Sequence, residues 1–391
     1  MINIDRIPHL LKYMGSKREI LYFINKAVED LDVDSSVFCD LFSGTAVVSA
    51  AFMDHYNVIS NDIQLYSSIF AHTYSANIAE HVGTNFQKVV MGKAECLFNE
   101  FCAKYPQYQF DYSEIRDYEE LAEIEKKQQS LIGEKFDLGF SLFAKNYSGT
   151  YWSYEQCVWI DSIRAVAEDY KDSAGYYAIL SALIFAMSYT TQSTGHFAQY
   201  RDVTRQNVED ILQYRRKDIS SIFAKKLDEL ILLLNSTPVH SMTVTTLDYL
   251  DCLRIVPEYS IVYADPPYSA VHYSRFYHVI ETLVRYDHPH LEYKGRYRDD
   301  RYQSPFDKRK EVANAFKSLF KAVDERKSHL ILSYSDNGLL KCDELLEIGE
   351  QTVGSNYDIS LEEKNYTHSK MGRSDENRLV VNELLFSFKR R

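Results

Sequence analysis

The chain has 391 residues, of which 45% are hydrophobic and 26% charged, and this composition excludes a disordered or fibrous protein. The most apolar run, Ala178 to Met187, is too short to span a bilayer and predicts a buried helix, so we expect no membrane association. The net charge of -12 at pH 7 argues against nucleic acid as a partner, unless basic residues gather on one surface.

The six cysteines include no C-x-x-C pair and no histidine at zinc-finger spacing, so neither a metal site nor a disulfide framework is indicated. The N-terminal segment MINIDRIPHLLKY lacks the pattern of a signal peptide. Both observations favour a cytoplasmic protein with reduced thiols.

The first predicted element is a short buried strand within VFCDLFSGT at 37–45, which turns through Ser43-Gly44 into the small, apolar segment VVSAAF. A second apolar strand, NVISNDI at 57–63, ends at an acidic residue. Strand, turn, helix and strand, with about twenty residues between Asp40 and Asp62, predict the first half of a doubly wound nucleotide-binding sheet.

The middle of the chain, residues 81–239, changes to long helical periodicities, such as the apolar positions from Ile219 to Leu234. We interpret it as a mostly helical insertion that carries target recognition. Strand character returns in TVTTLDYL at 243–250, YSIVYADPPY at 259–268 and SHLILSYSDNG at 328–338. Two last segments, SLEEKNYTH at 360–368 and RLVVNELLFSFK at 378–389, predict an antiparallel hairpin that closes the sheet. The predicted architecture is therefore α/β, with residues 1–80 and 240–391 forming one discontinuous catalytic domain.

Asp265-Pro266-Pro267-Tyr268 directly follows an apolar strand, which makes an ordinary proline turn a weaker explanation than a functional site. The turn has the groups that a reaction of the exocyclic amine of a nucleobase needs. Such an amine is a poor nucleophile, because its lone pair is delocalised into the ring. A carboxylate and the backbone carbonyl of the next residue offer two acceptors for its two protons, and the prolines rigidify the turn before the base arrives. Tyr268 is placed to stack on the base.

The segment DLFSGT at 40–45 is the candidate cofactor loop. Ser43-Gly44-Thr45 permits a close approach of the backbone to a ligand, and Asp40 places a carboxylate near the amino group of a bound methionine moiety. Asp62 has the position from which a carboxylate accepts hydrogen bonds from ribose hydroxyls. The chain contains neither G-x-x-x-x-G-K-[ST] nor G-x-G-x-x-G, so a nucleoside with a charged amino-acid tail fits better than a dinucleotide.

Four segments together resemble the alpha group of DNA adenine methyltransferases: LKYMGSKREI at 11–20, DLFSGTAVVSAAF at 40–52, SNDI at 60–63 and YADPPYSAVHYS at 263–274. The resemblance implies an S-adenosylmethionine (SAM)-dependent methyltransferase sheet with an inserted target-recognition domain, acting on the 6-amino group of adenine in double-stranded DNA. The implied cofactor-binding residues are Lys12, Tyr13, Gly15, Lys17, Asp40, Phe42, Ser43, Gly44, Thr45, Asp62, Ile63 and Asp248, and the implied catalytic residues are Asp265, Pro266, Pro267 and Tyr268.

Lys12 and Lys17 have an alternative interpretation as exposed lysines at the start of a helix. The loop also departs from the family pattern, because Ala46 stands where many relatives have a further glycine. GTYWS at 149–153, TGHFAQYR at 194–201 and FYHVIETLVRYDHP at 276–289 resemble a subgroup found in restriction and phage-defence systems, in which other defence subunits are possible partners.

An adenine inside a duplex must be flipped out to reach a buried cofactor. Tyr273 is a candidate to hold the flipped base, and Arg296, Arg298 and Arg301 in the basic stretch KGRYRDDR are candidate DNA contacts. Two alternatives stay open. One is methylation of another planar nitrogen, such as a cytosine amino group or adenine in RNA. The other is a catalytically silent DNA-binding subunit of a defence complex.

Overall fold

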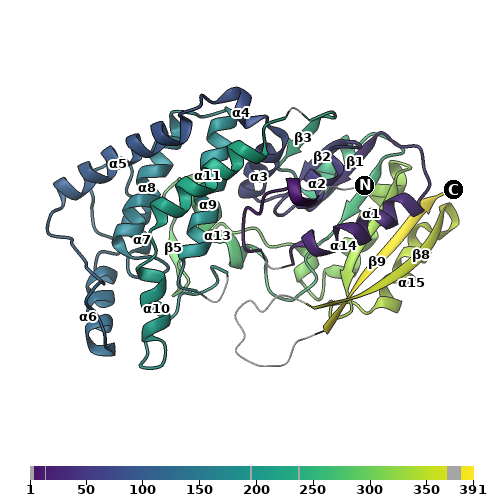
Figure 1. Ribbon diagram of the computed structural model, residues 1–391. Helices are drawn as coiled ribbons and strands as arrows, with labels where there is room; N and C mark the ends of the chain where they lie inside the picture. Colours follow the sequence, from purple (N-terminus) through teal and green to yellow (C-terminus); the bar gives the residue numbers. More distant parts are fainter. Residues whose placement is uncertain (1–3, 14, 194–195, 237, 368–379) are drawn as a thin grey trace.

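The computed structural model describes residues 4–13, 15–193, 196–236, 238–367 and 380–391. Of the segments analysed above, Met1, Ile2, Asn3, Met14, Thr194, Gly195, Thr237, His368, Arg378 and Leu379 lie outside the described residues. The described part contains a mixed α/β body with a central sheet and a block of helices to one side of it (Figure 1).

The central sheet has seven strands in the order β3-β2-β1-β4-β7-β9-β8. The first five in this order are parallel, and β9 runs antiparallel to both β7 and β8. The strands are β1 (Val37–Asp40), β2 (Asn57–Asn61), β3 (Met242–Thr245), β4 (Ile261–Ala264), β7 (His329–Ser335), β8 (Tyr357–Thr367) and β9 (Val380–Arg390). The predicted parallel sheet and its closing hairpin are confirmed. The strand order reverses at β1, between β2 and β4, and such a switch point is where open α/β sheets bind ligands.

The two faces of the sheet bury different sets of side chains, because successive residues of a strand point to opposite sides. Phe38 and Tyr263 pack with α1 (Leu21–Asp30), α2 (Val47–Phe52) and α3 (Leu65–Ser75). Their neighbours Cys39 and Val262 pack on the other face, under α12 (Tyr249–Ile255), α14 (Val312–Glu325) and α15 (Cys342–Val353). The sheet is therefore the middle layer of three.

The helical block follows α3 in the chain and begins with the short α4 (Ile78–His81). Its other helices are α5 (Phe86–Lys104), α6 (Tyr118–Gln129), α7 (Leu142–Tyr147), α8 (Tyr154–Glu168), α9 (Ala174–Thr190), α10 (Val208–Arg215) and α11 (Ile219–Leu233). The apolar run that predicted a buried helix is the centre of α9, and the side chains of Ile179, Leu180, Leu183 and Ile184 are fully buried. Capping supports these helices locally: the Ser153 hydroxyl accepts from the backbone N–H of Gln156, whose side chain in return accepts from the Ser153 N–H at the start of α8.

The helical block shares its apolar core with one face of the sheet, since α8 and α9 belong to the same buried cluster as β1 and α3. The domain boundaries at 81 and 239 remain a prediction. After β4 the chain forms α13 (Ser274–Arg285) and a small hairpin of β5 (Leu291–Glu292) and β6 (Tyr297–Arg298). In the part of the chain that the structure covers, no helix combines the length and apolar character needed to cross a membrane.

Candidate active site

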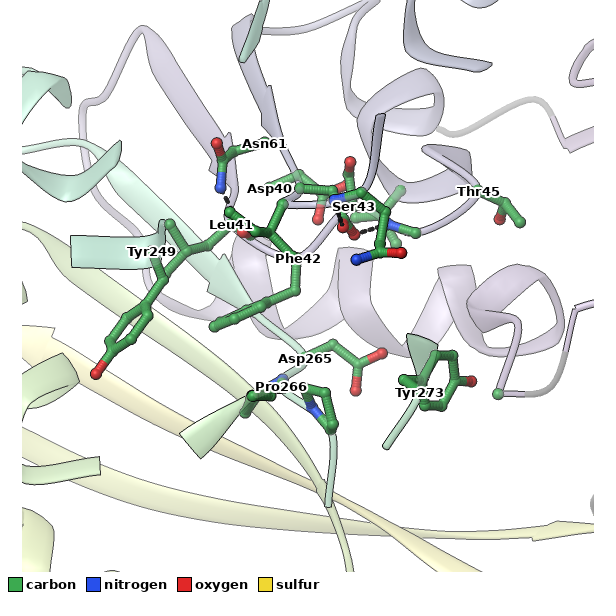
Figure 2. A pocket seen from close by; sticks show the side chains of 18 of the residues that line it. Asp40, Leu41, Phe42, Ser43, Thr45, Asn61, Tyr249, Asp265, Pro266 and Tyr273 are labelled. Carbon is green, nitrogen blue, oxygen red and sulfur yellow. Dashed lines mark hydrogen bonds between the residues drawn. The ribbon is translucent and has the colours of Figure 1, made fainter. Parts of the chain in front are cut away.

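A cavity opens at the carboxyl ends of β1, β2 and β4, where the strand order reverses. The loop after β1 and the Asp265-Pro266-Pro267-Tyr268 turn after β4 both line it, although more than two hundred residues separate them in the chain. Figure 2 shows Asp40, Phe42 and Ser43 on one side and Asp265 and Pro266 on the other. The parallel pairing of β1 with β4 explains this meeting, because it brings Asp40 beside Tyr263, two residues before Asp265.

The loop after β1 is shaped by Gly44, which has a φ of +52°. A Cβ atom at Gly44 would lie 3.0 Å from the Tyr13 hydroxyl and 3.2 Å from its ring, so there is little room for a side chain. The Gly44 backbone N–H donates to Asp62 Oδ2 at 2.9 Å, and the Gln64 N–H donates to Asp62 Oδ1 at 2.9 Å. Asp62 thus joins the loop after β1 to the end of β2.

Ala46, the departure from the family's glycine pattern, also adopts the left-handed conformation, with a φ of +55° and a ψ of 21°. This conformation costs a residue with a Cβ roughly 1 kcal/mol or more, which explains why glycine suits the position. The methyl group of Ala46 is fully buried in the core beneath the loop. Burial of the methyl group offsets part of the backbone strain.

Asp265 stands at the end of β4, all four residues of which are buried. The Lys17 ammonium lies 3.1 Å from Asp265 Oδ1, and both side chains are largely shielded, with 6% and 19% of their surfaces exposed. Burial raises the pKa of Asp265 to about 6, while Lys17 opposes the rise. Lys17 is therefore a buried partner of the catalytic candidate, and its alternative interpretation as an exposed lysine is wrong.

The cavity is acidic. Asp40, Asp62, Asp265 and Asp307 line it, and Lys17 is the only lysine or arginine among its described lining residues. Burial raises the pKa of Asp40 to about 7, of Asp62 to about 6 and of Asp307 to about 7. Four crowded carboxyl groups with one cation favour a ligand that carries positive charge.

An aromatic wall lies beside the Asp265-Pro266-Pro267-Tyr268 turn. The Tyr13 ring stacks on Tyr277 with 4.5 Å between centroids, and Tyr273 lies 5.5 Å from Tyr13 at an angle of 52°. Tyr13 and Tyr273 line the cavity, while Tyr277 is fully buried behind them. Figure 2 places Tyr273 at the edge of the cavity next to Asp265. The wall offers flat surfaces of the kind on which a nucleobase stacks.

Most of the predicted site residues meet at this cavity. Those that line it are Tyr13, Gly15, Lys17, Asp40, Phe42, Ser43, Gly44, Thr45, Asp62, Ile63, Asp265, Pro266, Pro267, Tyr268 and Tyr273.

Two predicted cofactor residues, Lys12 and Asp248, do not line the cavity. The Lys12 ammonium lies 4.0 Å from the centre of the Tyr189 ring on α9, so it turns toward the helical block. The Asp248 carboxylate caps α12 by accepting from the Leu250 N–H at 3.0 Å, and it accepts from the Tyr302 hydroxyl at 3.4 Å. The position of Lys12 thus does not support its predicted contact with the cofactor, and Asp248 lies behind the lining residue Tyr302.

The expectation that Arg298 contacts DNA is wrong. Arg298 is 2% exposed, and its guanidinium binds both oxygens of Asp287, at 2.6 and 2.8 Å. It also donates to Asp300 at 2.9 Å. A buried guanidinium with two carboxylate partners stabilises the turn around β6 and cannot reach a phosphate.

Arg296 and Arg301, the other two candidates of that stretch, are half-buried. Arg296 donates to Asn146 at 3.3 Å, and Arg301 donates from Nε to the Arg298 carbonyl at 3.0 Å. Lys294 in the same stretch is ion-paired with Asp202. The local acidic residues thus neutralise much of the charge that the sequence concentrates here, and DNA contacts by Arg296 and Arg301 stay a prediction.

Sequence reasoning missed several residues at the site. Asn61 joins three strand ends, donating to the carbonyls of Leu41 at 3.1 Å and Leu247 at 3.2 Å. Its place directly before Asp62 was a signal that the sequence contained. Asp307 follows β6 in a short 3-10 turn, Pro305–Asp307, and no pattern in the chain connects that turn with the cavity.

The model of the family described as "D12 class N6 adenine-specific DNA methyltransferase" matches residues 13–330 of the chain. Modification methylase LlaI of Lactococcus lactis subsp. lactis is 23% identical over 355 residues, covering 87% of this chain and 49% of the relative. Type II methyltransferase M.FokI of Planomicrobium okeanokoites is 26% identical over 354 residues, covering 86% and 46%.

The chain thus spans about half the length of these two curated relatives. Type II methyltransferase M.NlaIII of Neisseria lactamica is 22% identical over 357 residues, and here 87% of the chain covers 88% of the relative. The family model matches most of the chain, including the loop after β1 and the turn after β4 that meet at the cavity. The chain belongs to the D12 class of N6 adenine-specific DNA methyltransferases.

Proposed function

We propose that this protein transfers a methyl group from SAM to the 6-amino group of a flipped adenine in double-stranded DNA, as the modification enzyme of a restriction-modification or defence system. One observation carries the proposal: the glycine loop after β1 and the Asp265-Pro266-Pro267-Tyr268 turn line a single cavity. The type II modification methylases among the relatives support the restriction-modification context.

The acidic cavity fits SAM, which carries a sulfonium and an ammonium group against one carboxylate. Asp40 is buried and Asp62 is half-buried, and burial raises the pKa of both carboxyl groups. A cation beside them stabilises their ionised forms and is attracted by them in turn. Gly44 has a positive φ and no side chain, so the backbone of the loop can approach the ligand closely. We assign Asp40 and the loop to the methionine part, and Asp62 with Ile63 to the ribose and adenine.

The residues of the turn prepare the target amine. The Asp265 carboxylate and the Pro266 backbone carbonyl accept hydrogen bonds from its two N–H groups, so the nitrogen lone pair is released from the ring and points toward the methyl donor. SAM, when bound, supplies an electrophilic methyl group on a positively charged sulfur. The methylated nitrogen then loses one proton, and the Asp265 carboxylate is a group of the turn that can accept it. Tyr268 and Tyr273 hold the base by stacking.

The decisive experiment incubates the full chain with SAM and plasmid DNA from a host that lacks adenine methylation, followed by mass spectrometry of the nucleosides. We expect N6-methyladenine, and none with Asp265→Ala, while cofactor binding in equilibrium dialysis stays within about twofold because the cofactor contacts lie on other residues. N4-methylcytosine, or methylation of RNA alone, would support a different planar nitrogen. DNA binding without any methylated product would identify a silent DNA-binding subunit.

A further inference from the structure

Lys17 is buried between two carboxylates. Its ammonium lies 3.1 Å from Asp265 Oδ1 and 3.0 Å from Oε1 of Glu383, a residue of β9 with 2% of its side chain exposed. The Ser333 hydroxyl on the neighbouring strand β7 donates to the same oxygen of Glu383. Asp265, Lys17, Glu383 and Ser333 therefore form one connected polar network beneath the catalytic turn.

Glu383 does not line the cavity, so it has no direct access to a bound base or cofactor. The strand pairing holds it in place: β9 is antiparallel to β7, with Glu383 opposite Ser335. Any effect of Glu383 on the reaction must therefore act on Asp265 from behind, through the shared Lys17 ammonium and through the charge of Glu383 itself. A buried glutamate at this position is costly unless it is paired, and Glu383 is paired with the Lys17 ammonium and the Ser333 hydroxyl.

One oxygen of the Asp265 carboxylate belongs to the network, and the residue also lines the cavity. Oδ1 is buried against Lys17, and the exposed 19% of the side chain belongs to its other atoms. An ammonium that paired with Asp265 alone would draw electron density from the carboxylate and weaken it as a hydrogen-bond acceptor. Because Glu383 shares the ammonium, Asp265 keeps more of its basicity.

We propose that Glu383 is a positioning residue for methyl transfer, which shares the Lys17 ammonium and thereby keeps Asp265 a strong acceptor for the target amine. This inference rests on the proposed function. Ser333 moderates the effect, since its hydroxyl satisfies part of the charge of Glu383. The charges fit this arrangement: burial would lower the pKa of Lys17, but Asp265 and Glu383 together raise it well above its ordinary value.

The network predicts opposite effects for two substitutions. Glu383→Gln keeps the shape and removes the charge that raises the pKa of Asp265, so this pKa should fall by about one unit, which is a tenfold change in proton affinity. Ser333→Ala removes a hydroxyl that lowers the pKa of Asp265, so the pKa should rise. Neither substitution replaces any of the other titratable groups that face the network, which are Tyr263, Tyr268, Tyr273 and Asp40.

The experiment measures this pKa directly by NMR of protein labelled with ¹³C at the aspartate carboxyl carbons. The Asp265 signal is the one that disappears in Asp265→Asn. Glu362→Gln is the matched control, because Glu362 lies on the partner strand β8, with its ion pair to Lys26 at the surface. The acid limb of the kcat profile for N6-methyladenine formation should move with the pKa, downward in Glu383→Gln and upward in Ser333→Ala, while KM for SAM stays within about twofold.

Opposite shifts in the two variants and none in the control support the proposal. An unchanged pKa, or shifts of the same sign, would overturn it, and thermal unfolding of each variant shows whether the fold is intact. A wild-type protein that forms no N6-methyladenine refutes the proposed function, yet the carboxyl titration still decides whether Glu383 controls Asp265.

Discussion

Replacing Asp265 with asparagine should weaken methyl transfer and stabilise the folded protein at the same time. Burial raises the pKa of Asp265 from the ordinary value of 3.8 to about 6, even with Lys17 close by. This difference corresponds to roughly 3 kcal/mol, at about 1.4 kcal/mol per unit, by which the ionised carboxylate destabilises the folded state. Asparagine has the same shape without the charge, so the cost disappears.

The sign of this effect depends on pH. A carboxyl group with a raised pKa in the folded state binds its proton more tightly there than in the unfolded chain, so stability falls as the pH rises from about 4 to about 6. The whole penalty is present above the folded pKa. The gain in stability from Asp265→Asn should therefore be about a third of its full size near pH 4.5 and complete at pH 8.

Thermal unfolding at the two pH values checks this expectation. For a chain of this length, 3 kcal/mol corresponds to a rise of roughly 4 °C in Tm. At pH 8 we also expect methyl transfer to drop by about 100-fold, because the neutral amide is a weaker acceptor. Asp251→Asn, at an exposed position of α12, is the control and should change Tm little. An Asp265→Asn variant that is no more stable than wild type at pH 8 would refute the reasoning.

Four further outcomes are expected. Arg298→Ala should lower the free energy of unfolding by about 1 to 2 kcal/mol in urea titrations, because it removes a buried side chain and its hydrogen bonds to Asp287 and Asp300, and a purely DNA-binding arginine would instead leave stability unchanged. Gly44→Ala should weaken SAM binding by about tenfold in calorimetry, since the new methyl group meets a tyrosine and the backbone has a positive φ; unchanged affinity would contradict the shape assigned to the loop. Lys12→Ala should leave SAM affinity within about twofold, whereas a large loss would restore its predicted contact. SAM affinity should rise between about pH 5 and 8, with protons released on binding, because Asp40 and Asp62 must ionise to meet the cation; a flat profile would argue against their role.

The amino-acid sequence by itself predicted the sheet and the two turns that carry the site. Asp40 and Asp265 each end a short apolar strand, and this local pattern is strong because a buried parallel strand excludes polar residues until it ends. The resemblance of the same segments to a known family added the cofactor and the acceptor. These inferences depend on residues that are neighbours in the chain.

Only the tertiary structure decided what lies behind and around those turns. Arg298 is in a basic stretch by sequence, yet its guanidinium is paired with Asp287 and Asp300 in space. The number of basic residues in the stretch therefore overstated the positive charge that is available at the surface. Glu383 comes to Lys17 from the last strand, more than 350 residues away, because β9 inserts beside β7. Strand pairing over such separations is set by the packing of the whole sheet, and no local pattern encodes which buried charge will meet which partner.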